Sequence, residues 1–352
     1  MDQKIFPVVS CNPNNFFFNI NQNENQDSEF DLLIKEKWEK AQSENLFRYK
    51  LDIQQWKLLD GQYKFLTQLN VNRSENRRTP EEITSMSQPF NTERFHFNKI
   101  SNEEILFDIE CGDGNNVIAI NISPIERYHC LFIPQRLENL PQIATKKSVE
   151  NILELIMMSK SKNIRAIFNS LGAFASVNHL HWHLYYLEHR MPLENIVLQN
   201  IDGSPVHLLV DFPTKGFCVT FSSLKNKTTN NLTNWVFLII NYLQNNNIAH
   251  NVFITRGNTT HSEQNFDDIR VYIWARKHDY GIKNTRAFYP AVCELFGHLS
   301  IRNPEDYDSL TEMQVVEIMK DVTEEPFYSV KEKIIEIVQQ QLLLENKNVD
   351  NI

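Results

Sequence analysis

Three histidines alternate with apolar residues in the stretch NHLHWHLY at residues 178–185. They are His179, His181 and His183. Successive side chains of a β-strand point to opposite faces of a sheet, so the imidazoles would share one face while the apolar residues between them enter the core. On an α-helix the same side chains would lie about 200° apart around the axis and could not act together. The alternation therefore predicts a strand that carries three titratable rings in a row.

Three uses of such a row are open. In the first, the histidines lie solvated on an edge strand. In the second, a His-x-His pair supplies two zinc ligands and a distant residue the third, although no cluster of partner ligands stands out in the sequence. In the third, the neutral ring of His181 attacks a phosphorus atom and forms a phosphoramidate, which divides one difficult transfer into two easier steps. Three of the eleven histidines lie within these five residues, which favours the third use.

Nucleophilic catalysis requires particular partners around the central ring. The second ring nitrogen of His181 must be held as an N–H donor, typically by a backbone carbonyl. The flanking histidines would donate hydrogen bonds to the phosphoryl oxygens, where negative charge must be stabilised in the transition state.

The elements that position these residues follow from the apolar periodicity. We predict strands at 105–109, 117–120, 130–133, 165–168 and 177–187, the last of which holds the histidines. A similar order follows, with strands at 206–210, 217–221, 251–255 and 270–275 around a helix at 232–243. Further helices are predicted from residue 28 past Trp38 and at 53–69, 148–159, 310–321 and 328–345. The predicted fold class is α+β, with antiparallel sheets, packed helices and two similar halves.

We expect three parts along the chain. Residues 1–45 would form an Asn-rich, partly mobile arm, largely unstructured up to residue 27, followed by a helix. A catalytic half would occupy 46–200, and a diverged second half with C-terminal helices would occupy 201–352.

Composition excludes several classes of protein. The 352 residues include 35 Lys+Arg and 44 Asp+Glu, a net charge of −9, which argues against a nucleic-acid protein that binds through bulk charge. Neither Gly-rich phosphate-binding motif is present, so any nucleotide must be bound by side chains. The five cysteines are scattered, and we find no signal peptide and no membrane-spanning apolar stretch. We therefore expect a cytoplasmic protein with reduced thiols and no membrane partner.

Basic residues are further candidates for phosphate binding. Arg73, Arg77 and Arg78 lie in a polar connector, residues 70–88. This connector would be either a solvated loop or a phosphate-binding segment, because guanidinium groups match phosphate geometry.

Two weaker signals complete the set. Arg256, Arg276 and Lys277 end two predicted strands, where they would either complete a phosphate pocket or merely mark strand ends. The segment FHFNK at 95–99 would supply an aromatic wall for a purine base, although aromatic residues at strand spacing are more often core residues.

The histidine pattern resembles the signature of the histidine-triad (HIT) nucleotide transferases and hydrolases. The surrounding segment FNSLGAFASVNHLHWHLYYLEHR at 168–190 is similar to the animal GDP-D-glucose phosphorylase family, which is related to plant GDP-L-galactose phosphorylases and to galactose-1-phosphate uridylyltransferases. The same family pattern is present in FLTQLNVNRSENRRTP (65–80), INISPIERYHCLFIP (120–134) and CELFGHLSIRNPEDYDSLTE (293–312). The resemblance spans nearly the whole chain beyond residue 45.

The resemblance implies roles for particular residues. His181 would become guanylylated, with His179 and His183 in support. Asn169 and Ser176 stand where HIT proteins place polar contacts to the phosphates, and His129, a further candidate for substrate or phosphate binding, occupies the place of the family's Gly-His pair.

The sequence departs from the family pattern at three positions. Tyr128 stands where relatives have Gly, which puts the approach of that loop to a ligand in doubt. Trp182 and Leu184 replace the usual Leu and Gly without changing a reacting group. Glu294 and His298 lie in a family-like segment and have no assigned role.

The activity implied by the resemblance is phosphorolysis of GDP-α-D-glucose to GDP and α-D-glucose 1-phosphate, with inorganic phosphate as second substrate and no cofactor or metal. A homodimer is possible. A HIT-type nucleotide-sugar hydrolase, a guanylyltransferase for another GDP-hexose and a non-enzymatic nucleotide-binding protein stay open as alternatives. The residues alone do not choose the base, the sugar, or phosphate over water as acceptor.

Overall fold

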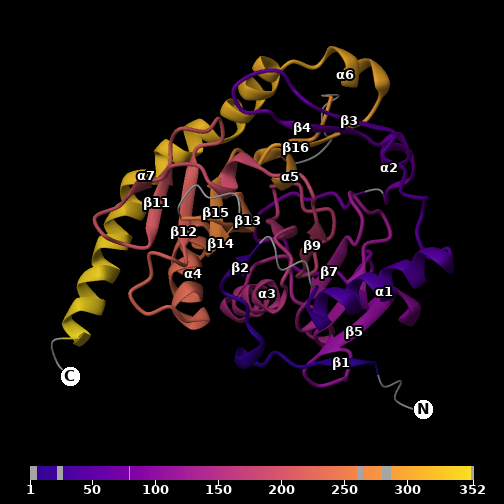
Figure 1. The fold of residues 1–352 in the computed structure, drawn as a ribbon, viewed down its shortest axis with the longest axis horizontal. Helices are drawn as coiled ribbons and strands as arrows, with labels where there is room; N and C mark the ends of the chain where they lie inside the picture. Colours follow the sequence, from indigo (N-terminus) through magenta and orange to yellow (C-terminus); the bar gives the residue numbers. More distant parts are fainter. Residues whose placement is uncertain (1–5, 22–26, 79, 260–264, 280–286, 350–352) are drawn as a thin grey trace.

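The computed structural model describes residues 6–21, 27–78, 80–259, 265–279 and 287–349, which form one eleven-stranded sheet, two smaller sheets and packed helices (Figure 1). The strands of the large sheet are β1 (Val8–Val9), β5 (Ile105–Ile109), β6 (Val117–Ile120), β7 (Cys130–Ile133), β8 (Ile164–Asn169), β9 (Trp182–Tyr186), β10 (Gln199–Asn200), β11 (Val206–Leu209), β12 (Gly216–Thr220), β13 (His250–Gly257) and β15 (Asp268–Ala275). The smaller sheets pair β2 (Ile20–Asn21) with β14 (Asn265–Phe266), and β3 (Gln55–Leu58), β4 (Leu66–Leu69) and β16 (His298–Ile301) with one another.

The helices connect and cover these sheets. They are α1 (Glu29–Ser43), α2 (Val71–Asn76), α3 (Lys146–Met158), α4 (Thr229–Asn245), α5 (Val292–Leu295), α6 (Pro304–Ser309) and α7 (Glu312–Val349). Short 3-10 helices lie at η1 (Pro13–Asn15), η2 (Phe97–Lys99), η3 (Asn102–Glu104), η4 (Arg136–Glu138) and η5 (Pro192–Glu194). Within the described ranges, no helix combines the length and the apolar character that a membrane span requires.

The large sheet is built from two similar halves. Its strand order is β1-β5-β6-β7-β9-β8-β13-β15-β12-β11-β10, and all neighbours except β1 and β5 are antiparallel. The order β6-β7-β9-β8 in the first half corresponds to β11-β12-β15-β13 in the second, with α3 between β7 and β8 and α4 between β12 and β13. The halves join where β8 pairs with β13. The predicted α+β fold is therefore confirmed, and the two halves share one continuous sheet.

Helices cover one face of the large sheet. In α3, Val149, Ile152, Leu153 and Ile156 are buried at the spacing of one helical face. They pack with residues of α1, α4 and the later part of α7 into a core that includes Trp182 and Leu184 of the sheet. The predicted helices at 148–159 and 232–243, and the strands at 105–109, 117–120 and 130–133, are confirmed.

The opposite face is covered by the β3-β4-β16 sheet, α5, α6 and the first part of α7, which form a second core. The predicted helix at 53–69 is wrong, because this segment is the antiparallel pair β3 and β4. The spacing of Trp56 and Leu59 suggested a helical face, but Trp56 is exposed on β3, whereas Leu59 and Phe65 are buried. The apolar residues thus do not share one side of a helix.

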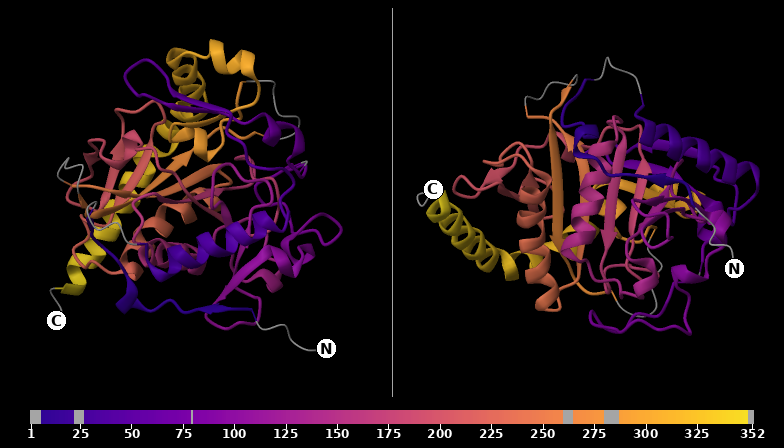
Figure 2. Two further views of the ribbon diagram at one scale, coloured as in Figure 1. Left: turned by 45° about the vertical axis from the view of Figure 1, so that its right-hand side comes forward. Right: turned by 90° about the horizontal axis from the view of Figure 1, so that it is seen from below.

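Two further expectations are corrected. The predicted pair of C-terminal helices is one helix, α7, with Pro326 inside it (Figure 2). Val315 and Met319 pack in the second core and Val330 and Ile334 in the first, so contacts on both sides hold the helix together across the proline. In the arm, the described residues 6–21 pair through β1 and β2 and pack against the core, while 1–5 and 22–26 lie outside the described residues.

Asp31 connects α1 to α3 and β9. It is fully buried, and its carboxylate accepts hydrogen bonds from the Ser28 N–H (3.0 Å), the Ser159 hydroxyl (2.5 Å), the Lys160 N–H (2.9 Å) and the Tyr186 hydroxyl (2.7 Å). Replacement by Ala would leave these buried donors without an acceptor. We expect Asp31→Ala to lower the free energy of unfolding by about 3–5 kcal/mol, measured by urea denaturation.

Asp27→Ala is the matched control for this prediction. Asp27 forms a partly exposed ion pair with Lys35 (2.6 Å), so its loss should change the free energy of unfolding by about 1 kcal/mol or less. A loss below about 1 kcal/mol for Asp31→Ala would show that the network contributes little.

Candidate active site

The backbone around His181 is held by a side chain rather than by a neighbouring strand. The Gln142 amide accepts from the His181 N–H (2.8 Å) and donates to the His181 carbonyl (3.0 Å), and the Leu180 N–H donates to the Leu140 carbonyl (2.9 Å). Because these partners occupy the backbone groups, the predicted strand at 177–187 is wrong for its first residues, and only β9 is a strand. The predicted alternation still holds, since Leu180, Trp182 and Leu184 all enter the helix-covered core.

The His181 ring has one occupied nitrogen and one available nitrogen. Its Nδ1 lies 2.7 Å from the His179 carbonyl oxygen, which can only accept, so Nδ1 carries the proton. Burial lowers the pKa of His181 to about 4, so the ring is neutral near pH 7 and Nε2 has a lone pair. This is the arrangement that a nucleophilic imidazole requires.

The His183 ring is the opposite tautomer, with its proton on Nε2 instead of Nδ1. The Nδ1 of His129 accepts from the Ile125 N–H (3.0 Å), so the neutral His129 ring carries its proton on Nε2, which lies 3.0 Å from the His183 Nδ1. His183 therefore accepts at Nδ1 and presents Nε2–H. Burial holds the pKa of both rings well below the usual range, which keeps them neutral. The resulting N–H group can donate to an oxygen of a ligand.

His179 is fully buried and both of its ring nitrogens have partners. Its Nδ1 accepts from the Phe97 N–H (3.0 Å), and its Nε2–H donates to the Arg136 carbonyl (3.1 Å). Its own carbonyl holds the ring of His181. The three histidines thus differ in the ring atom that each leaves available. His181 has an acceptor nitrogen, His183 has an N–H donor and His179 has neither, so the three rings do not form a set of metal ligands.

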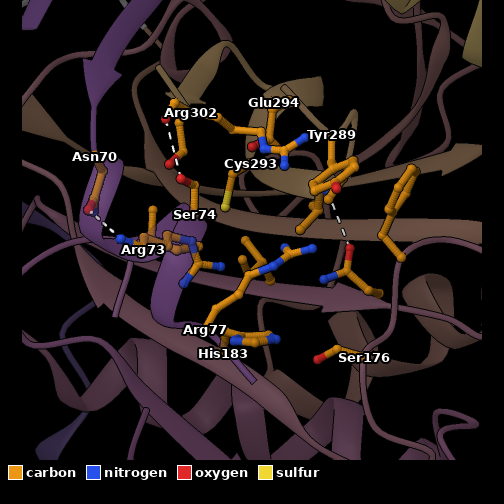
Figure 3. A pocket seen from close by; sticks show the side chains of 17 residues that line it. Asn70, Arg73, Ser74, Arg77, Ser176, His183, Tyr289, Cys293, Glu294 and Arg302 are labelled. Atoms are coloured by element: carbon orange, nitrogen blue, oxygen red, sulfur yellow. Dashed lines mark hydrogen bonds between the residues drawn. The ribbon is translucent and has the colours of Figure 1, made fainter. Parts of the chain in front are cut away.

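Two cavities meet beside the histidines. An apolar-walled cavity contains His181 and is bounded by Phe95, Phe97, Ile100, Ile120, Leu131 and Val177. A polar cavity lies next to it, bounded by Asn70, Ser74, Tyr289, Glu294 and Arg302 (Figure 3). The two share Arg73, Arg77, Ser176 and His183. Both phenylalanines of the segment 95–99 line this cavity, and their contact with a purine base stays a prediction.

Guanidinium groups surround the junction of the cavities. Arg77 and Arg302 lie 4.7 Å and 4.8 Å from the centre of the Tyr289 ring, and Arg73 donates to the Ser123 carbonyl. Burial and the neighbouring Arg73 lower the pKa of Arg77, which stays cationic at neutral pH because its ordinary value is 12.5. A chain with a net charge of −9 thus has a locally positive site suited to phosphate.

Chain topology explains this convergence. The parallel strands β4 and β16 end at the same edge of their sheet, so Asn70 and Arg302, which follow them, lie side by side. The Asn70 side chain caps α2 by accepting from the Arg73 N–H (3.1 Å). The connector that begins at residue 70 is therefore folded over the cavities rather than being a solvated loop.

Arg78 and the two predicted HIT contacts lie at the cavities. Arg78 lines the apolar-walled cavity, 3.0 Å above the centre of the Phe95 ring, and burial lowers its pKa to about 10. Asn169 lines the polar cavity, where its oxygen accepts from the Asn251 amide (2.7 Å) and leaves its own amide nitrogen as the available group. Ser176 is exposed at both cavities.

Four predicted phosphate ligands are corrected because they line neither cavity. His129 is fully buried behind His183. Arg256 donates to carbonyls of Ile156 and Ser159 on the helix side of the sheet. The others are Arg276, which donates to Asn251 and Pro290, and Lys277, which forms surface ion pairs with Asp321 and Glu325.

Sequence reasoning missed Gln142, Tyr289 and Arg302. Arg302 carried a usable signal, a basic residue at the end of an apolar strand, which Arg256 and Arg276 share. Gln142 carried none, because its role depends on a contact across 39 residues. His298 is buried in the second core and contacts Gln68 (2.6 Å) rather than a cavity. Among the described residues, no group of three or more His, Cys, Asp or Glu side chains could hold a metal ion.

Tyr128 adopts the conformation that explains a glycine in relatives. Its φ is 59°, in the left-handed region that favours Gly. The side chain compensates by packing edge-on against Trp38 and Tyr186 and by donating to Glu39 (2.9 Å). The substitution therefore directs a ring toward α1, away from both cavities.

Comparisons with known proteins cover most of the chain. Residues 29–185 match the family model "GDPGP1-like, N-terminal domain", and residues 187–341 match "GDPGP1-like, C-terminal domain". GDP-D-glucose phosphorylase 1 of Xenopus laevis is 36% identical over 340 residues, covering 83% of each chain, and the Homo sapiens protein of that name is 37% identical, covering 84% and 79%. GDP-L-galactose phosphorylase 2 of Arabidopsis thaliana is 30% identical, covering 88% and 76%. Yeast Ap4A phosphorylase Apa2 in complex with Ap4A has a TM-score of 0.59 at 14% identity, covering 84% and 97%, and so shares the fold.

Proposed function

This chain belongs to the GDPGP1-like family, and we propose that it is a GDP-D-glucose phosphorylase. It converts GDP-α-D-glucose and inorganic phosphate to GDP and α-D-glucose 1-phosphate. The observation that carries the proposal is the neutral His181, with its Nε2 available, beside an apolar-walled cavity and an arginine-rich polar cavity.

The reaction proceeds in two displacements at the α-phosphorus. In the first, the Nε2 lone pair of His181 forms the N–P bond while the bond to the bridging oxygen breaks, and glucose 1-phosphate leaves with that oxygen. In the second, an oxygen of inorganic phosphate attacks the same phosphorus, the N–P bond breaks, and GDP leaves. Free neutral His181 is regenerated, so no net proton is stored on the ring.

The surrounding residues have separate tasks. The Nε2–H of His183 donates to a phosphoryl oxygen, where charge accumulates in the transition state. Arg73, Arg77 and Arg302 bind the leaving sugar phosphate or the incoming phosphate in the polar cavity. The guanosine occupies the apolar-walled cavity, where the ring of Phe97 lies 4.9 Å from that of His181.

Incubation of GDP-glucose with and without phosphate tests this function. We expect GDP and sustained release of glucose 1-phosphate only when phosphate is present. Without phosphate we expect a protein-bound GMP adduct in intact-mass spectra and at most one glucose 1-phosphate per protein molecule. GMP released without phosphate would indicate a nucleotide-sugar hydrolase instead. A faster reaction with another GDP-hexose would reassign the sugar, and nucleotide binding without turnover would indicate a binding protein.

The setting of the enzyme is also proposed. The cysteines Cys11, Cys111, Cys130, Cys218 and Cys293 are free thiols, which agrees with the reducing cytoplasm. A homodimer is expected from the resemblance, and light scattering on the purified protein tests it. Neither nucleic acid nor a membrane is expected as a partner.

A further inference from the structure

Two buried polar atoms in the polar cavity have no hydrogen-bond partner. They are the Oε2 of Glu294, whose residue is 7% exposed, and the Nδ2 of Asn70, whose residue is 2% exposed. An unsatisfied buried polar group destabilises the folded protein, so such atoms in a cavity indicate a ligand that pairs with them. The Glu294 oxygen is a hydrogen-bond acceptor, and the Asn70 nitrogen is a donor.

Each of the two side chains is fixed by its other contacts. The Asn70 oxygen caps α2, which leaves the amide nitrogen directed away from the cap. Glu294 lies on α5, and backbone N–H groups of Ala291 and Ser300 face its carboxyl group. In Figure 3 both residues lie on the side of the cavity away from His183 and Ser176, with Arg77 between the two sides.

The chemistry of the pair separates a sugar from a phosphate. A carboxylate oxygen repels a phosphate dianion, and the arginines already match that anion. The hydroxyl groups of a sugar, in contrast, both donate and accept, so one of them can donate to Glu294 and another can accept from Asn70. Burial raises the pKa of Glu294 to about 7, and its protonated form still has an accepting oxygen.

We propose that Asn70 and Glu294 form a sugar-recognition subsite that binds hydroxyl groups of the hexose in the leaving hexose 1-phosphate. This inference rests on the proposed function and adds the residues that select the sugar. It assigns the part of the polar cavity that is shared with the apolar-walled cavity, where Arg73 and Arg77 lie, to the phosphate, and the part at Asn70 and Glu294 to the hexose ring.

The test separates the two half-reactions. Exchange of labelled phosphate into GDP needs guanylylation of His181 and phosphate binding but involves no hexose. Turnover of GDP-glucose needs the sugar subsite as well. For Glu294→Gln and for Asn70→Ser, which keeps a capping oxygen, we expect kcat/KM for GDP-glucose to fall by about 10–100-fold. The exchange rate should stay within about threefold, and the preference for GDP-glucose over GDP-mannose should shrink.

Glu305→Gln is the matched control, because Glu305 is exposed on α6 and lines neither cavity. Urea denaturation confirms that each variant is folded. An equal fall in exchange and in sugar turnover would assign the residues to the phosphate and overturn the subsite, as would unchanged sugar turnover. Absence of exchange in the unmodified protein would instead contradict the proposed function itself.

Discussion

Replacement of His181 by Asn is expected to abolish the GMP adduct and to lower turnover of GDP-glucose by about 10⁴-fold or more. The Asn side chain is close to imidazole in size and polarity, but its amide nitrogen has no lone pair that can attack phosphorus. Both half-reactions pass through the same N–P bond, so exchange of phosphate into GDP should be lost together with sugar turnover. Stopped assays and intact-mass spectra measure these effects.

His207→Asn serves as the control for this prediction. His207 lies on β11 in the second half, where its Nε2 contacts the hydroxyls of Thr220 (3.0 Å) and Ser223 (3.2 Å). The residue lines neither cavity. Its replacement should leave turnover within about twofold, since substitutions away from such sites have small effects. An adduct that persists in His181→Asn would assign the nucleophile to another residue.

Acid is expected to unfold the protein between about pH 5 and 6, because the structure contains buried neutral histidines. The fully buried or nearly fully buried ones are His129, His179, His181, His250 and His298, and His183 is partly buried. Burial is the largest cause of the lowered pKa of each, which falls to about 4 for His181 and His250 and to about 3 for His179 and His298.

The sign and size of the effect follow from proton linkage. Below the unfolded pKa of 6.5, the unfolded chain binds protons that the folded chain does not, so stability falls as the pH decreases from 6.5 toward 4. Each of the four histidines whose pKa falls to about 3 or 4 contributes about 2 kcal/mol of loss between pH 7 and pH 5. Glu294, with its raised pKa of about 7, titrates in the opposite sense and offsets about one histidine. The remaining loss, about 6 kcal/mol, is comparable to the total stability of a typical domain. The lowered pKa values of His129 and His183 act in the same direction.

Urea denaturation at a series of pH values measures this slope, and His250→Phe provides the matched comparison. The Nε2 of His250 has no partner, and its ring packs against Phe168 with centroids 6.0 Å apart, so an apolar ring suits the site. Between pH 7 and pH 5, the free energy of unfolding of the variant should fall by about 2 kcal/mol less than that of the unmodified protein. A free energy of unfolding that stays constant across this range would show that these histidines have nearly the same pKa in the folded and the unfolded chain.

Local pattern was sufficient for several strands and for the direction of the side chains beside the histidines. Alternation places Leu180, Trp182 and Leu184 in one core in the structure, as predicted, because side-chain direction along an extended chain depends only on neighbours in sequence. The strands at 105–109, 117–120 and 130–133 have the predicted bounds for the same reason. At 53–69 the local spacing was misleading, because Trp56 and Leu59 fit a helical period although Trp56 is exposed on a strand and Leu59 is buried.

The alternating pattern alone predicts that three histidines lie together and shows which of them is central. The available nitrogen of each ring can be assigned only in the folded protein, because it depends on the carbonyl of His179 for His181 and on His129 for His183. It also decided which basic residues reach the site. Arg302 lies beside Asn70 because β16 pairs with β4 in parallel, whereas Arg256 points to the opposite face of the large sheet. A sequence pattern records the residues of one strand, whereas the cavities are formed by strands far apart in the chain.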